Sequence, residues 1–257
     1  PGAMVVPDTD SFPVPTDTGL SRSAPAPIGE AVVNEKWEFT VLEVRRGDDL
    51  SAELEDSFSW IEEPADGREY VAVRLRARYL GRIERTVIVS GFDLAATGSK
   101  NVLYEVPFAL VFEPGFWYEV FPGAVVEGWV TYEVGKAETN LMLRLGDRFG
   151  LEPENERFVA LEAGASLAGP QGRLEEQNSV GVEESSPAGV GVASVGPTWR
   201  IEVIQVVRGT DALDALLAAN SFTDPPGDRF EYLLIEVDVR NVADIDELKR
   251  LSEFNFQ

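Results

Sequence analysis

The sequence predicts an all-β protein, built as two antiparallel β-sandwich domains in tandem, the second of them incomplete. Two observations predict this class. Residues 37–47 (WEFTVLEVRRG) come again as residues 199–209 (WRIEVIQVVRG), and the alignment runs without a gap at an offset of 162 residues as far as Phe92 and Phe254. Short segments of alternating apolar and polar residues are separated by glycine and proline turns, without a long helical pattern.

The repeated segment has the pattern of a half-buried strand, since Trp37, Phe39 and Val41 alternate with polar residues. Gly47 ends it. A short helix is predicted next. In the second copy, leucines at helical spacing over residues 210–219 follow a capping Thr or Asp, and residues 48–54 of the first copy carry a weaker version of this pattern.

The next strand is predicted over residues 70–79, with alternate apolar residues on an inner face and Arg74, Arg76 and Arg78 on the outer face. In the second copy the inner positions stay apolar and the outer ones change, as expected if only the inner face packs against another sheet. Further strands are predicted over residues 86–90, 102–112, 125–134, 141–145 and 158–161.

These patterns predict four segments along the chain. Residues 1–28, rich in proline and poor in apolar residues, are expected to form a disordered tether. Residues 29–162 form the first sandwich, 163–198 a flexible linker rich in Gly, Ala, Ser and Glu, and 199–257 the partial second domain. Gln257 aligns with Ala95, so we expect either that the chain is a fragment or that another chain supplies the missing strands, which includes self-association through this domain.

Composition excludes several function classes. The net charge of −23 disfavours nucleic acid and acidic membranes as partners. The absence of Cys and His removes thiolate nucleophiles, the usual general base and most transition-metal sites. Carboxylate pairs such as Asp48-Asp49 and Glu62-Glu63 lack the spacing of a calcium loop. We therefore expect no enzyme activity, no metal and no cofactor. No apolar run is long enough for a transmembrane segment.

The order of elements resembles a bacterial family of immunoglobulin-like domains of unknown function, common in secreted or lipid-anchored surface proteins. The resemblance rests on residues 37–41 with Gly47, on residues 70–75, on residues 92–94 and, most specifically, on residues 122–134 (PGAVVEGWVTYEV) with their central Gly-Trp. It implies immunoglobulin-like sandwiches and an extracytoplasmic location, although no signal peptide is visible. It implies no catalytic residues.

A group of aromatic residues flanks the turn at Pro114-Gly115, and it includes Phe116, Trp117 and Tyr118. Its other members are Phe108, Phe112 and Phe121. They either fill one end of the sandwich or form an exposed binding surface, since aromatic side chains contribute a large apolar area at low entropic cost. Consecutive residues of a strand alternate between its faces, so at least one of the three at 116–118 should be exposed.

The row of Arg74, Arg76 and Arg78 is a second candidate surface. It could receive an acidic partner, or it could be a solvated face paired with nearby carboxylates. These observations together predict a non-catalytic binding or structural module that engages a protein or a glycan at the cell surface. The alternative is a carbohydrate-binding or accessory module of a surface enzyme system.

Overall fold

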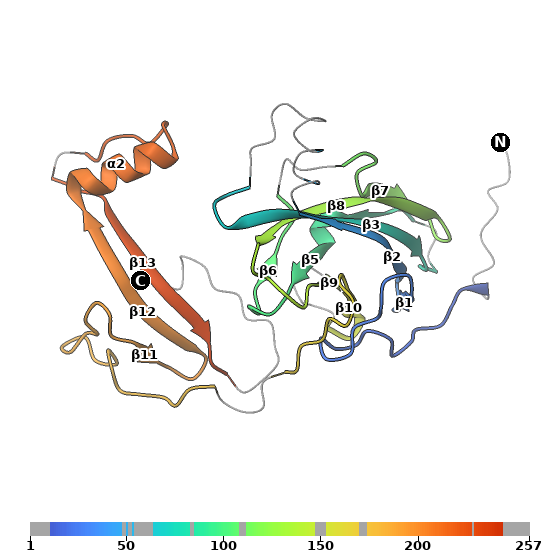
Figure 1. Cartoon of the computed structure of the whole chain (residues 1–257), viewed down its shortest axis with the longest axis horizontal. Helices are drawn as coiled ribbons and strands as arrows, with labels where there is room; N and C mark the ends of the chain where they lie inside the picture. Colours follow the sequence, from blue (N-terminus) through green and yellow to red (C-terminus); the bar gives the residue numbers. More distant parts are fainter. Residues whose placement is uncertain are drawn as a thin grey trace. The chain divides into compact units, whose positions relative to one another are not determined.

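A computed structural model describes residues 11–47, 50, 53, 64–82, 85–107, 112–146, 153–169, 174–227 and 229–243. The chain divides into two compact units, Pro1–Ala168 (unit 1) and Gly169–Gln257 (unit 2). Most of the described structure is β, in several antiparallel sheets (Figure 1). Each unit is described separately below.

The first sheet of unit 1 has the strand order β1-β2-β3-β8, and all of its pairings are antiparallel. Its strands are β1 (Ala31–Val33), β2 (Trp37–Arg46), β3 (Arg68–Tyr79) and β8 (Val125–Gly135). The strands predicted over 37–47, 70–79 and 125–134 are confirmed with small shifts at their ends. The helix predicted over 48–54 lies outside the described residues, apart from positions 50 and 53.

The second sheet of unit 1 has the order β10-β9-β5-β6, and a separate pair joins β4 to β7 (Figure 1). Its strands are β5 (Leu94–Thr97), β6 (Leu103–Tyr104), β9 (Met142–Leu145) and β10 (Arg157–Ala160). The pair consists of β4 (Val87–Ser90) and β7 (Trp117–Val120), and two 3-10 turns, η2 (Gly91–Asp93) and η3 (Pro153–Asn155), complete the unit. The strand predicted over 102–112 is only two residues long where it is described, while β5 and β7 lie where no strand was predicted.

The core of unit 1 lies between these sheets. Val73 and Leu75 of β3 are fully buried in the same cluster as Ala96 of β5, Leu143 of β9 and Val159 of β10. The predicted inner face of β3 therefore packs against the second sheet, as in a β-sandwich.

Residues 11–28 are packed against unit 1, although their composition predicts a disordered tether. Ala26 is buried and forms a parallel bridge with Val159. Its amide donates to the carbonyl of Phe158 at 2.9 Å, and its carbonyl accepts from the amide of Ala160 at 2.7 Å. The flanking prolines are compatible with this arrangement because a strand at a sheet edge leaves alternate N–H groups without a ladder partner.

Unit 2 contains one three-stranded antiparallel sheet with the order β11-β12-β13. Its elements are β11 (Ser194–Val195), β12 (Trp199–Arg208), the helix α2 (Gly209–Ala219) and β13 (Leu233–Asn241). The helix connects β12 to β13 (Figure 1). Among the described residues of unit 2, no strand takes the place of β8 and no second sheet is present. β11 lies within the segment predicted to be a linker.

The strand register of unit 2 repeats that of unit 1. Trp37 pairs with Tyr79 and Trp199 pairs with Asn241, and both members of the second pair lie 162 residues after those of the first. Each pairing has a bulge at the equivalent place, between residues 41 and 43 in β2 and between residues 203 and 205 in β12. Pairing depends on register and a slip by one residue would reverse the faces, so the two hairpins present equivalent residues on equivalent faces.

The end of the first strand is also equivalent in the two units. Gly47 has a φ of 98° and Gly209 a φ of 64°. A positive φ is unfavourable for residues with a Cβ atom, so glycine is the residue suited to both positions. The role predicted for Gly47, which is to end the strand, is filled in the same way by Gly209.

Candidate functional site

The aromatic residues at 116–118 are distributed by the alternation of β7. Phe116 is buried in the core, and Tyr118 is half-buried, with its hydroxyl donating to the carbonyl of Glu127. Trp117, between them, is 60% exposed. One of the three therefore faces solvent, as the alternation argument predicts, and it is the largest.

Trp117 belongs to an apolar surface that we call the β4–β7 outer face: Ile88, Trp117, Glu119 and Phe121. Ile88 is 57% exposed and Phe121 is 48% exposed. The register pairs Ile88 with Glu119, so Trp117 and Phe121 are its diagonal neighbours on the same face. The hydroxyl of Thr86 donates to Glu119 at 2.6 Å, which places Thr86 on this face too.

The position of the Trp117 ring is set from one side by Phe92. The two rings are 5.9 Å apart at 85°, an edge-to-face contact. Phe92 lies in η2, where the Asp93 carboxylate accepts from the Ser90 amide at 3.0 Å and from its hydroxyl at 3.1 Å. The aromatic surface therefore stands on a hydrogen-bonded turn.

The Gly-Trp pair at 128–129 supports the other end of β7. The Trp129 amide donates to the Pro114 carbonyl at 2.9 Å, and the Phe116 amide donates to the Trp129 carbonyl at 3.0 Å. A Cβ atom at Gly128 would lie 2.8 Å from the carbonyl oxygen of Gly115. The close approach of these two backbones requires glycine at position 128.

The other predicted aromatic residues divide between core and surface. Phe112 is buried in a small cluster with Leu50, Tyr70 and Ala72, and its ring lies 5.5 Å from that of Trp129. Phe108 lies outside the described residues. The group thus fills one end of the sandwich and also forms an exposed surface.

The row of arginines on β3 is neutralised by carboxylates. Arg74 and Arg76 both contact Glu127, at 2.9 and 2.7 Å, and Arg78 lies 3.9 Å from Glu38. The hydrogen bond from Arg76 is the main cause that holds the pKa of Glu127 below its usual range. Arg74, Arg76 and Arg78 therefore have the contacts of a solvated, ion-paired face.

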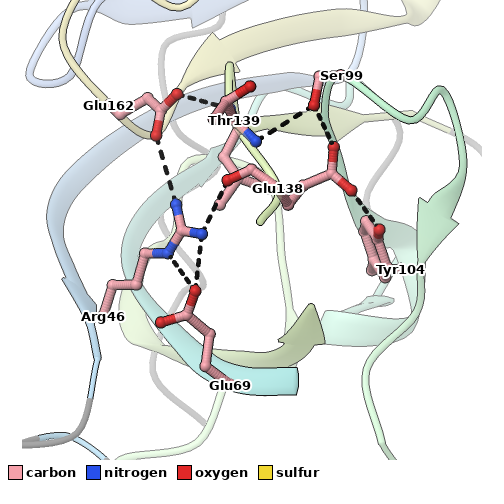
Figure 2. A network of polar contacts seen from close by, with 8 residues as sticks. Arg46, Glu69, Ser99, Tyr104, Glu138, Thr139 and Glu162 are labelled. Carbon is pink, nitrogen blue, oxygen red and sulfur yellow. Dashed lines mark hydrogen bonds and ion pairs between the residues drawn. The ribbon is translucent and has the colours of Figure 1, made fainter. Parts of the chain in front are cut away.

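A buried polar network, absent from the sequence predictions, surrounds Glu138 (Figure 2). Glu138 is 1% exposed. Its carboxylate accepts from the Ser99 hydroxyl at 2.9 Å, from the Lys100 amide at 2.8 Å and from the Tyr104 hydroxyl in a short contact. Burial and then the hydrogen bond to Glu138 raise the pKa of Tyr104 to about 12.

Arg46 connects this network to the strands of the first sheet (Figure 2). Its guanidinium donates to Glu69 at 2.7 and 2.9 Å, to Glu162 at 3.4 Å and to the carbonyl of Glu138 at 2.8 Å. Each carboxylate in the network is engaged by donors of the chain itself. The arrangement ties the end of β2 and the start of β3 to the turn after β8, which is a structural role.

Two searches for other sites cover the described part of the chain. Within it, no group of three or more Asp or Glu side chains is placed to hold a metal ion. No helix found there is long and apolar enough to cross a membrane.

No protein-family model matches the sequence, and no curated protein does either. The resemblance to the immunoglobulin-like family therefore has no support from a family model.

The solved structures similar to this chain are bacterial β-sandwich or secreted proteins. The yjhA protein of Bacillus subtilis is 13% identical over 53% of this chain and 99% of its own, with a TM-score of 0.36. The secreted protein MPT63 of Mycobacterium tuberculosis is 9% identical over 54% of this chain and 97% of its own, with a TM-score of 0.35. A proposed lipoprotein of B. subtilis, ycdA, is 10% identical over 51% and 37%, with a TM-score of 0.38.

Proposed function

We propose that this protein is a non-catalytic binding module that engages a partner protein through the β4–β7 outer face. The observation that carries the proposal is Trp117, 60% exposed beside Ile88 and Phe121, which are 57% and 48% exposed. Single exposed apolar residues are ordinary, but adjacent large ones on one face are typical of an interaction surface.

The composition of this face fits a protein interface. Tryptophan and other aromatic residues are enriched at the centres of interfaces, where they fill pockets of the partner and lose little rotamer entropy. The edge-to-face contact with Phe92 restricts Trp117 before it binds, which lowers the entropic cost of association further. Glu119 sits among the apolar side chains and supplies one acceptor for a donor of the partner.

A glycan is the second candidate ligand, favoured by the polar groups beside the indole. Glu119 and Thr86 are hydrogen-bonded to each other on the same face as Trp117. A sugar ring could stack on the indole while its hydroxyls bond these two side chains. In that case the protein is a carbohydrate-binding or accessory module.

Three single substitutions separate these candidates. Envelope fractions of the cells that carry the gene are incubated with the labelled chain, and glycan arrays are probed in parallel. Trp117→Ala abolishes binding in both cases. Ile88→Ala weakens binding to a protein, whereas Glu119→Gln weakens binding to a glycan. Val102→Ala, at a residue 48% exposed elsewhere in unit 1, is the matched control. Unchanged binding by Trp117→Ala would refute the proposal.

Two further parts of the proposal concern the fold and the location of the protein. Both units are taken as immunoglobulin-like domains, with unit 2 a copy of the first three strands of unit 1. The shared register and bulge support the duplication. An extracytoplasmic location rests on the family resemblance, and fractionation of cells that carry the natural gene tests it.

A further inference from the structure

The β12–β13 hairpin has one charged face and one apolar face. The charged face carries Arg200, whose guanidinium contacts Glu202 and, at 2.8 Å, Asp238. The apolar face carries the alternate residues of both strands. They are Trp199, Ile201, Val203, Val206, Leu233, Ile235, Val237 and Val239. No charged residue stands among them.

The equivalent face of unit 1 shows how such a surface is normally covered. Val71, Val73 and Leu75 of β3 are 0% exposed because the second sheet packs on them. The residues 162 positions later are Leu233, Ile235 and Val237, which are 50, 52 and 37% exposed. The same face that is sandwich core in unit 1 is therefore open to solvent in unit 2.

We propose that the apolar face of β12–β13 packs against the same face of a second copy of this chain, related by a two-fold axis. The occupant must be a sheet that presents an apolar, uncharged surface, because any charge buried there would lack a partner. In unit 1 the inner faces of both sheets are already used in the core. Among the described residues, the sheet face that meets these requirements is the β12–β13 face itself, and a two-fold axis makes it self-complementary.

The size of the face sets the expected strength of the dimer. Its most exposed members are Val206 at 41%, Leu233, Ile235 and Val237. They and their half-buried neighbours would bury on the order of 400 to 500 Å² per copy, which places the interface at the low end for a specific complex. We therefore expect a dissociation constant in the micromolar range and a dimer that forms over roughly 1 to 100 µM protein.

Sedimentation velocity of the full chain over this concentration range tests the proposal. The wild-type chain is expected to shift from monomer to dimer. Ile235→Glu should raise the dissociation constant at least about tenfold, because it places an unpaired charge in the interface. Gln205→Glu adds the same charge on the opposite face of the sheet, beside Glu236 in the register, and should leave the dimer in place. Leu233→Glu is a second interface variant.

The outcomes are distinct from those of the binding proposal. Position 235 is half exposed in the single unit, so Ile235→Glu should fold, and circular dichroism checks this. A wild-type chain that remains monomeric at 100 µM overturns the proposal, as does a dimer that tolerates both Ile235→Glu and Leu233→Glu. Trp117→Ala should not change the association, so loss of the Trp117 surface and loss of the dimer are measured separately.

Discussion

Replacing Glu138 by alanine removes the acceptor that joins the turn at 98–100 and strand β6 to the end of β8. Three donors converge on this carboxylate, from Ser99, Lys100 and Tyr104. A hydrogen bond to a charged group contributes roughly 1.5 to 3 kcal/mol when both partners are buried. Ser99 and Lys100 are exposed, so water replaces part of what they lose.

The expected cost of Glu138→Ala is therefore about 2 to 4 kcal/mol in the free energy of unfolding of unit 1. Glu138→Gln should cost less, about 1 to 2 kcal/mol, because the amide retains one acceptor oxygen and its NH₂ group can donate to the Tyr104 hydroxyl. Glu43→Ala removes an exposed carboxylate from β2 and should change stability by less than about 0.5 kcal/mol.

Urea unfolding followed by near-UV circular dichroism measures these differences. The two variants at position 138 separate loss of charge from loss of an acceptor. A change below about 0.5 kcal/mol for Glu138→Ala, or equal effects of Glu138→Ala and Glu138→Gln, would refute the description of this network as a structural tie.

Four other substitutions have outcomes set by the geometry. The pKa of Tyr104 is raised to about 12 in the folded chain, above its usual value near 10, so its contribution to stability is present below pH 10 and is lost as the pH rises from 10 to 12. Tyr104→Phe should flatten the decline of the melting temperature in that window. Tyr132 is fully buried and its hydroxyl has no hydrogen-bond partner among the described residues, so Tyr132→Phe should stabilise the chain by about 1 kcal/mol in urea unfolding. Gly128→Ala should lower the free energy of unfolding by more than about 1 kcal/mol, because the new methyl group meets backbone atoms; an unchanged urea midpoint would contradict the close approach. Trp117→Ala should cost less than about 0.5 kcal/mol in the same assay, and a large loss would assign this side chain to the core.

The sheets were predictable where one face of a strand is buried. Alternation identifies β2, β3 and β8 because residues such as Val41, Val73 and Val130 must all point toward the second sheet. The repeat at an offset of 162 residues then predicts a related hairpin in unit 2, and the register agrees with it. These signals are local, so a single sequence contains them.

Long-range pairings were not predictable in the same way. Composition predicts disorder for residues 11–28, but Ala26 is held by two hydrogen bonds to β10, more than a hundred residues away. Glu138 follows a glycine turn and reads as a solvated charge. Its burial results from donors at 99–104 that only the folded chain brings to it.

The candidate surface was predicted in part. Alternation requires one exposed residue among positions 116–118, but which one depends on the pairing of β7 with β4. Ile88 was not identified because its exposure depends on the same pairing. The exposed face therefore becomes visible only after the hairpin is assembled.

The account depends most on the shared register of the two hairpins, and disulfide trapping tests it directly. The chain has no cysteine, so each introduced pair reports unambiguously. Thr40 pairs with Arg76 and Glu202 with Asp238 in the two units, and cysteines at either pair are expected to form an intramolecular disulfide on mild oxidation. Coupling of a cysteine at 202 to one at Val237, in preference to one at Asp238, would contradict the register and with it the duplication.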